Sequence, residues 1–136
     1  MQSLTLELAA NYLERAMSKA RQEFGRPICV AICDPSGFLI AFARMEGAPL
    51  RSIQISQSKA YTAVRMGVST DALLARLKKE GIEIGYFCDP LMTALPGGNL
   101  LKDAAGVLLG AIGISGLAAT EDQVITEYVA ELAKAT

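Results

Sequence analysis

The chain has 136 residues, the size of one ordinary domain, and 51% of them are hydrophobic against 20% charged, which excludes a disordered or low-complexity chain. Thirteen Lys and Arg against fourteen Asp and Glu give a net charge of -1, without the basic surplus expected for a nucleic-acid partner. The absence of His excludes Ser-His-Asp and Cys-His catalysis, His-liganded zinc and a haem held by a proximal His.

The first predicted element is an amphipathic helix over residues 4–24, where apolar side chains recur every three or four positions. Gly25 is expected to end this helix in the left-handed conformation, and Pro27 prevents its continuation. Residues 1–7 lack the basic region and apolar run of a secretory signal. We therefore expect a cytoplasmic protein.

A β-hairpin is predicted next, from two short β-branched runs at residues 28–33 and 38–45. The sequence Asp34-Pro35-Ser36-Gly37 between them has Asp first, Pro second and Gly fourth, as a type I turn requires. Both strands are apolar on both faces, so we expect the hairpin to be covered on each side.

The three cysteines are expected to be free thiols. Cys29 and Cys33 are four residues apart in one predicted strand, so their Cα atoms would lie about 13 Å apart, too far for a disulfide. They are expected to act as small buried hydrophobes. Cys88 lies in a loop-like stretch, where it is either inert or the one reactive thiol of the chain.

A helix over residues 52–67 follows, with a face of small residues that would allow its backbone to lie close to a sheet. These small residues are Ser56, Ala60, Ala63 and Gly67. Lys59 is one residue away from that face, and we expect its ammonium group to be solvated. A shorter helix, capped by Ser69 or Thr70, is expected to end near Gly81.

Residues 82–99 show no sustained hydrophobic period and contain several Gly and Pro, so they are predicted to form a long loop with at most a short strand. A loop of this length in a compact domain is usually functional or part of an interface. Residues 100–103 and 107–115 then predict a second hairpin, and a capping box at Thr120 and Gln123 predicts a closing helix.

This order of elements predicts an α+β fold with an antiparallel sheet, within a single domain spanning residues 1–136. The uncharged stretch 104–120 is shorter than the roughly 20 residues of a membrane-spanning helix and is interrupted by glycines. We therefore read it as a buried strand followed by a loop, and expect no association with a membrane.

The glycines between Gly110 and Gly116 follow neither the dinucleotide-binding pattern nor a P-loop. Two interpretations remain open: close packing of the strand, or a ligand lying against it. The turn at residues 96–99 is explained either by turn chemistry alone or by the approach of its backbone to a partner. Arg44, after an apolar strand, either lies at the surface or lines a cavity, while Lys102 is expected to be solvated.

No spacing of carboxylates indicates an acid–base pair or a metal site. The candidates considered are Asp89, Asp103 and Asp122. We therefore lean against catalysis, and expect no resident metal ion.

Several ordered blocks together resemble one known family. They are Val30-Ala31-Ile32-Cys33-Asp34-Pro35-Ser36-Gly37, Arg44-Met45-Glu46-Gly47-Ala48, Ser58-Lys59-Ala60-Tyr61-Thr62-Ala63, Gly97-Gly98, Gly110-Ala111-Ile112-Gly113-Ile114-Ser115-Gly116 and Asp122. The chain resembles, over nearly its whole length, the GlcG/HbpS-like family, which includes haem-binding proteins and the C-terminal domain of PduO-type corrinoid adenosyltransferases.

The resemblance implies an antiparallel sheet of about five strands flanked by helices, profilin-like in shape, and assembly into homo-oligomers. It also implies haem or another tetrapyrrole as ligand, although no His is present to ligate haem iron. The function expected is a non-catalytic small-ligand-binding accessory protein. The alternatives are an enzyme acting on a small carboxylated metabolite, and a structural module without a ligand.

The ligand is expected where Arg44, the Pro96-Gly97-Gly98 turn and the end of the second hairpin converge. The residues predicted to contact it are Arg44, Gly97, Gly98, Gly113, Ser115 and Gly116. Glycines allow backbone amides to reach a ligand, and an Arg can hold a carboxylate through two hydrogen bonds. The convergence follows from the resemblance and from chain order.

Overall fold

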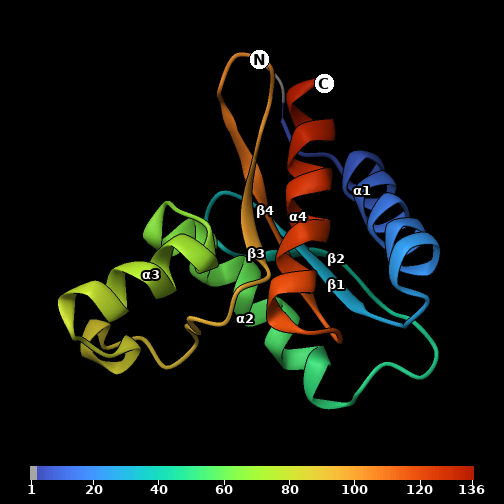
Figure 1. Cartoon of the computed structure of the whole chain (residues 1–136). Helices are drawn as coiled ribbons and strands as arrows, with labels where there is room; N and C mark the ends of the chain where they lie inside the picture. Colours follow the sequence, from blue (N-terminus) through green and yellow to red (C-terminus); the bar gives the residue numbers. More distant parts are fainter. Residues whose placement is uncertain (1–2) are drawn as a thin grey trace.

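Four antiparallel strands in the order β2-β1-β4-β3 form the sheet at the centre of the computed structural model, which describes residues 3–136 (Figure 1). The elements in chain order are α1 (Leu6–Lys19), β1 (Cys29–Cys33), β2 (Leu39–Arg44), α2 (Arg51–Met66), α3 (Thr70–Glu80), β3 (Gly98–Lys102), β4 (Leu108–Ser115) and α4 (Ala119–Lys134). This order agrees with the predicted one: a helix, a hairpin, two helices, a loop, a second hairpin and a closing helix. The predicted α+β class is therefore confirmed.

The sheet has four strands, so the expectation of about five is wrong. Between α3 and β3 the chain forms a 3-10 turn, η2 (Ile84–Phe87), and an irregular loop. Pro90 and Pro96 in that loop lack an amide hydrogen, which makes a further paired strand unfavourable there.

The two faces of the sheet differ in side-chain size. On one face lie the branched side chains of β1 and β4, which pack against α1 and α4: Val30, Ile32, Ile112 and Ile114. The opposite face carries smaller side chains and lies against α2: Ala31, Cys33, Ala111 and Gly113. Helix α3 packs beside α2, away from α1 (Figure 1).

The small face brings the main chain of α2 onto the sheet. A Cβ atom at Gly113 would lie 1.9 Å from the carbonyl oxygen of Ser56 and 2.6 Å from the amide nitrogen of Ala60. At Gly110 it would lie 2.0 Å from the carbonyl oxygen of Cys33. At these two glycines the structure supports the packing interpretation.

Both predicted hairpins are confirmed, and an aspartate closes each turn in the same way. Asp34 Oδ1 accepts hydrogen bonds from the amides of Ser36 and Phe38 at 2.9 and 3.0 Å. Asp103 Oδ1 accepts from the amides of Ala105 and Val107, both at 2.9 Å. Asp103, considered above as a catalytic carboxylate, therefore has a turn-forming role.

Three local predictions need correction. Strand β1 is buried throughout, but β2 is an edge strand and is only partly covered, because no strand pairs with its outer side. Helix α1 ends at Lys19, and a π-helical turn, η1 (Ala20–Phe24), continues to the left-handed Gly25. Helix α4 begins before Thr120, because the Glu121 carboxylate accepts the amide hydrogen of Ala118 at 3.1 Å.

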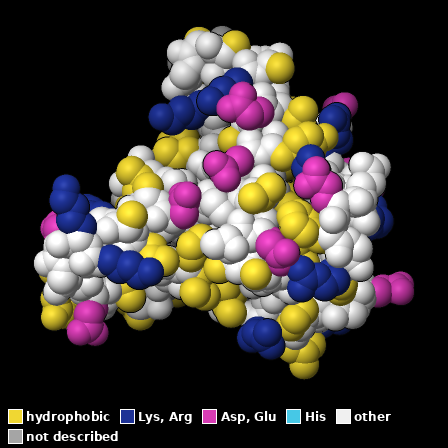
Figure 2. Space-filling view, viewed as in Figure 1, with side chains coloured by type: hydrophobic (Ala, Val, Ile, Leu, Met, Phe, Trp, Pro, Cys, Tyr) yellow, Lys and Arg dark blue, Asp and Glu magenta, His cyan; other side chains and the backbone are white. Residues whose placement is uncertain are grey.

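No helix within residues 3–136 is long and apolar enough to cross a membrane. Residues 1 and 2, part of the stretch judged for a secretory signal, lie outside the described residues. On the face drawn in Figure 2, Lys and Arg are interspersed with Asp and Glu, and apolar side chains are exposed between them.

Gly113→Ala should destabilise the protein by about 3 kcal/mol or more, at or above the upper range for over-packing, because its methyl group would meet the backbone of α2. Gly85→Ala is the matched control, since a Cβ atom there has no neighbour within 4 Å. Urea unfolding of the two variants and the parent measures the difference. Equal stability of the two variants would contradict the close packing of α2.

Candidate functional site

A buried ion pair links α2 to α4. Lys59 Nζ lies 3.1 Å from Asp122 Oδ2 and donates a second hydrogen bond to the carbonyl oxygen of Ile114 at 2.7 Å. Each of the two charged residues is 1% exposed. The prediction that Lys59 is solvated is therefore wrong, and Asp122, which no sequence spacing marked, is its partner.

The position of Lys59 follows from helical spacing. It is three residues after Ser56 and four before Ala63, both of which face the sheet. Residues at these separations share a helix face, so Lys59 faces the sheet with them. The sequence therefore contained a signal for its burial, but not for its partner 63 residues away.

Burial has the largest effect on the protonation of both groups. It lowers the pKa of Lys59 and raises the pKa of Asp122 to about 6, while the attraction between the two charges acts against each shift. The second oxygen of the carboxylate, Asp122 Oδ1, accepts the amide hydrogen of Leu117 at 3.1 Å. The pair thus also fixes the connection from β4 to α4.

The turn at residues 96–99 is built around this pair. A Cβ atom at Gly97, whose φ is +123°, would lie 2.6 Å from Lys59 Nζ. The amide of Gly97 donates to Gln123 Oε1 at 2.6 Å, and that of Gly98 donates to Thr70 Oγ1 at 2.8 Å. Both amides, predicted to contact a ligand, are thus bonded to side chains of the protein.

A cavity of about 210 Å³ lies at the end of β4, and we call it the Ser115 cavity. Ser115 and Gly116 line it together with Arg51 and Ser52 of α2 and the Lys59–Asp122 pair. Ser115 Oγ lies 3.1 Å from Ser52 Oγ. Two of the predicted ligand residues, Ser115 and Gly116, therefore share a polar cavity with a charged pair.

Arg44 lines a different and larger space, of about 410 Å³, which we call the Arg44 hollow. It is bordered by Met17, Arg21, Arg44, Met45 and Glu46. Arg44 pairs with Cys29 of β1, which in turn pairs with Ser115, so one strand separates the two predicted ligand residues. Within one chain, Arg44 therefore lines one site and Ser115 and Gly116 line another, whereas the other predicted residues, Gly97, Gly98 and Gly113, line neither.

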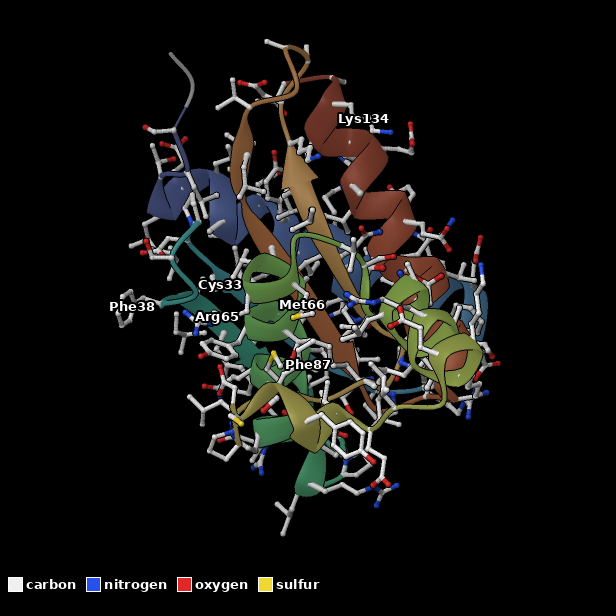
Figure 3. The ribbon with its side chains drawn as sticks, turned by 90° about the vertical axis from the view of Figure 1, so that its left-hand side faces the viewer. Cys33, Phe38, Arg65, Met66, Phe87 and Lys134 are labelled. Carbon is white, nitrogen blue, oxygen red and sulfur yellow. The ribbon has the colours of Figure 1, made fainter. Side chains whose placement is uncertain are left out.

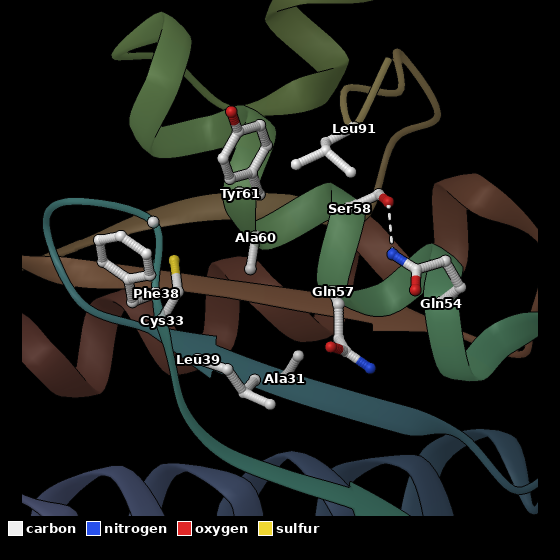
Figure 4. Close-up of a pocket in the computed structure, with 11 residues that line it drawn as sticks. Ala31, Cys33, Phe38, Leu39, Gln54, Gln57, Ser58, Ala60, Tyr61 and Leu91 are labelled. Carbon is white, nitrogen blue, oxygen red and sulfur yellow. Dashed lines mark hydrogen bonds between the residues drawn. The ribbon is translucent and has the colours of Figure 1, made fainter. Parts of the chain in front are cut away.

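A third cavity, of about 180 Å³, lies between α2 and the first hairpin (Figure 4). Its lining is mainly apolar and includes Phe38, Leu39 and Leu91, with Cys33 at its inner side. Burial raises the pKa of the Cys33 thiol to about 12, which makes it unreactive. No group of three metal-ligating side chains occurs in the part of the chain that the structure describes.

Residues 4–131 match the family model described as "Haem degrading protein HbpS-like". The chain belongs to the HbpS-like family. This match covers most of the chain and confirms the resemblance that the sequence blocks indicated.

Two curated proteins and one solved structure are similar to this chain. An uncharacterized 15.0 kDa protein of Citrobacter freundii, from the dhaT-dhaS intergenic region, is 29% identical over 88% of this chain and 84% of its own length. The corrinoid adenosyltransferase PduO of the same organism is 30% identical over 85% of this chain, which spans only 35% of PduO. The crystal structure of a PduOC–heme complex aligns with a TM-score of 0.84 at 27% identity, covering 97% of this chain and 95% of that one.

The carboxyl carbon of Asp122 should titrate near pH 6, because burial raises its pKa. Asp89 is the internal control, since a hydrogen bond from Tyr61 lowers its pKa. In the unfolded chain the pKa of an Asp is about 3.9. Because the pKa of Asp122 is higher in the folded state, protonation of this carboxylate favours folding. The contribution of Asp122 to the free energy of unfolding should therefore fall as the pH rises from about 4 to about 6, whereas Asp89 and Glu121, whose pKa values are lowered, contribute in the opposite direction at the acid end of this range.

Carbon-13 NMR of the labelled protein measures both titrations, and urea unfolding across this pH range measures the stability. A midpoint for Asp122 at or below that of Asp89 would show that attraction to Lys59 outweighs burial.

Proposed function

We propose that the protein is a non-catalytic small-ligand-binding protein whose ligand is a tetrapyrrole held in the Arg44 hollow. The observation that carries this proposal is the composition of the hollow's border, where two guanidinium groups and two thioethers, with the single carboxylate of Glu46, surround one space of about 410 Å³. That volume lies within the roughly 300–1,000 Å³ of small-molecule pockets.

The two kinds of side chain suit the two parts of haem. Arg21 and Arg44 can each bind a carboxylate such as a propionate through paired hydrogen bonds. The thioethers of Met17 and Met45 are donors of a type that binds haem iron. Met45 Sδ already accepts the amide hydrogen of Ile28 at 3.4 Å, so Met17 is the freer of the two.

The absence of His means that haem would be held here without the commonest axial ligand. The family membership supports the choice of a tetrapyrrole, since one structural neighbour is described as a heme complex. How this chain would hold a tetrapyrrole is inferred from the residues of the Arg44 hollow and not from those of the PduOC–heme complex.

The two alternatives make different predictions for a ligand. An enzyme acting on a small carboxylated metabolite would convert that metabolite, whereas a ligand-free structural module would bind neither haem nor a small acid. The two serine hydroxyls that line the Ser115 cavity are hydrogen-bonded to each other and not to a general base within residues 3–136, which favours binding over catalysis.

Haemin added to the protein should bind saturably, with about one haemin per chain, and change the visible absorption spectrum. Arg44→Ala should raise the Kd roughly 10- to 100-fold, because the loss of a charge-assisted hydrogen bond corresponds to about 1.5–3 kcal/mol. Haemin dimethyl ester, which lacks the carboxylates, should bind the parent weakly. Met17→Leu should alter the spectrum of the bound iron.

Arg76→Ala is the control for loss of one guanidinium, because Arg76 lies on α3, pairs with Glu80 and does not border the hollow. Each variant is first compared with the parent in melting temperature. Equal affinity of the parent and Arg44→Ala for haemin would eliminate this site, and no binding by the parent would eliminate the proposed function.

We further propose that the protein forms a closed homo-oligomer through the rim of the apolar cavity beside the first hairpin. Phe38, Leu39 and Leu91 line that cavity and are 72%, 50% and 54% exposed, so this part of the surface is apolar. Phe38 points away from the body of the protein (Figure 3). A mean hydropathy of +0.32 in so small a chain favours the same conclusion.

Light scattering should give a particle mass at least twice the 14.4 kDa of one chain. Phe38→Glu should shift the distribution towards the single chain, because it places a charge in the apolar contact. Leu50→Glu is the control, since Leu50 is 75% exposed but does not line this cavity. A particle of 14.4 kDa for the parent at micromolar concentration contradicts the proposal.

Three further proposals concern the location, domain organisation and shape of the protein. We propose a cytoplasmic location, with which the free buried thiols of Cys29 and Cys33 are consistent. We also propose a single domain over residues 1–136 and a profilin-like shape.

A further inference from the structure

We propose that the Ser115 cavity is a second binding site, for a small carboxylic acid of about two to four carbon atoms, separate from the Arg44 hollow. The inference rests on unmatched hydrogen-bond donors, on the charges that face the cavity and on its size. It does not depend on a tetrapyrrole in the Arg44 hollow.

The first argument is the balance of donors and acceptors. Ser52 and Ser115 are 1% and 6% exposed, and their hydroxyl oxygens lie 3.1 Å apart, so one hydroxyl hydrogen lies between them. The other hydroxyl hydrogen has no acceptor within residues 3–136.

The ammonium group of Lys59 also has a hydrogen without an acceptor in the described part of the chain. It has three hydrogens, and its two acceptors are the Ile114 carbonyl and Asp122. Its third hydrogen also lacks an acceptor among the described side chains and backbone. Each of these buried atoms already has at least one partner, but one further hydrogen on the serine pair and one on Lys59 remain available beside the cavity to an occupant that accepts hydrogen bonds.

The second argument is charge. Lys59 and Asp122 cancel, and Arg51, which lines the cavity and is itself exposed, adds one positive charge where the cavity meets solvent. An occupant with a single negative charge would neutralise this excess. A carboxylate meets both requirements, because it accepts several hydrogen bonds and pairs well with a guanidinium group.

The third argument is size. The cavity measures about 210 Å³, which is below the roughly 300 Å³ at which pockets for drug-sized ligands begin. Apolar side chains, Ile55 and Leu95, complete its lining beside the polar groups. A short acid, with its carboxylate on the donors and its carbon chain on these side chains, fits such a space.

Acetate and lactate are the probes, and acetamide is the neutral isostere of acetate. In an amide NMR titration up to roughly 50 mM, above the millimolar range of weak binding, both acids should shift the resonances of Gly116 and Ala119 saturably. Acetamide should not. Ser52→Ala and Arg51→Gln should each raise the Kd of the better acid at least fivefold.

Ser58→Ala is the matched serine control, because Ser58 is on the same helix but lines the apolar cavity. Arg44→Ala should bind the acid as the parent does, which distinguishes this site from the Arg44 hollow. Arg51 is exposed, so Arg51→Gln should fold even if Ser52→Ala does not.

No saturable shift with either acid, or an unchanged Kd in both Ser52→Ala and Arg51→Gln, would overturn the proposal. Equal binding of acetamide would overturn the assignment of a carboxylate. A crystal structure grown in acetate that shows only water in the cavity would also overturn it.

Discussion

The close approach of α2 to the sheet sets the conditions for the rest of the structure. Gly113 allows the backbone of the helix to contact β4 directly, and this contact leaves no space for a long side chain to turn towards solvent from the inner face. Lys59 lies on that face, so its ammonium group is buried. A buried charge requires a partner of opposite sign and further hydrogen bonds, which Asp122 and the Ile114 carbonyl provide.

The buried pair in turn determines the conformation of two connections. The carboxylate of Asp122 holds the Leu117 amide, and therefore the path from β4 into α4. Lys59 Nζ occupies the space beside Gly97 that a side chain would otherwise fill. Both connections lie next to the Ser115 cavity, so the groups that stabilise the fold also give this cavity its charge. A substitution in the pair would change stability and site together.

Local sequence signals were sufficient for most of the fold. The turn at Asp34-Pro35-Ser36-Gly37 and the glycines predicted to end two helices, Gly25 and Gly81, depend on residues a few positions apart, and their predicted positions agree with the structure. Strand number was not predictable in this way, because residues 82–97 carry no period. The site was less predictable still: the spacing of Lys59 indicated burial, but Asp122 lies 63 residues away, and only the folded chain brings them together.

The division of the predicted ligand residues follows from the sheet order. Arg44 and Ser115 lie at the same end of the sheet, which is why chain order suggested that they converge. Strand β1 lies between them, and neighbouring strands are about 4.8 Å apart, so their backbones are separated by about 10 Å. The two residues therefore have different surroundings: Arg44 has a second guanidinium, two thioethers and the Glu46 carboxylate, whereas Ser115 has a second hydroxyl and an ion pair. We therefore propose different ligands for the two sites at this sheet end: a large ligand with carboxylates and a metal for the first, and a short acid for the second.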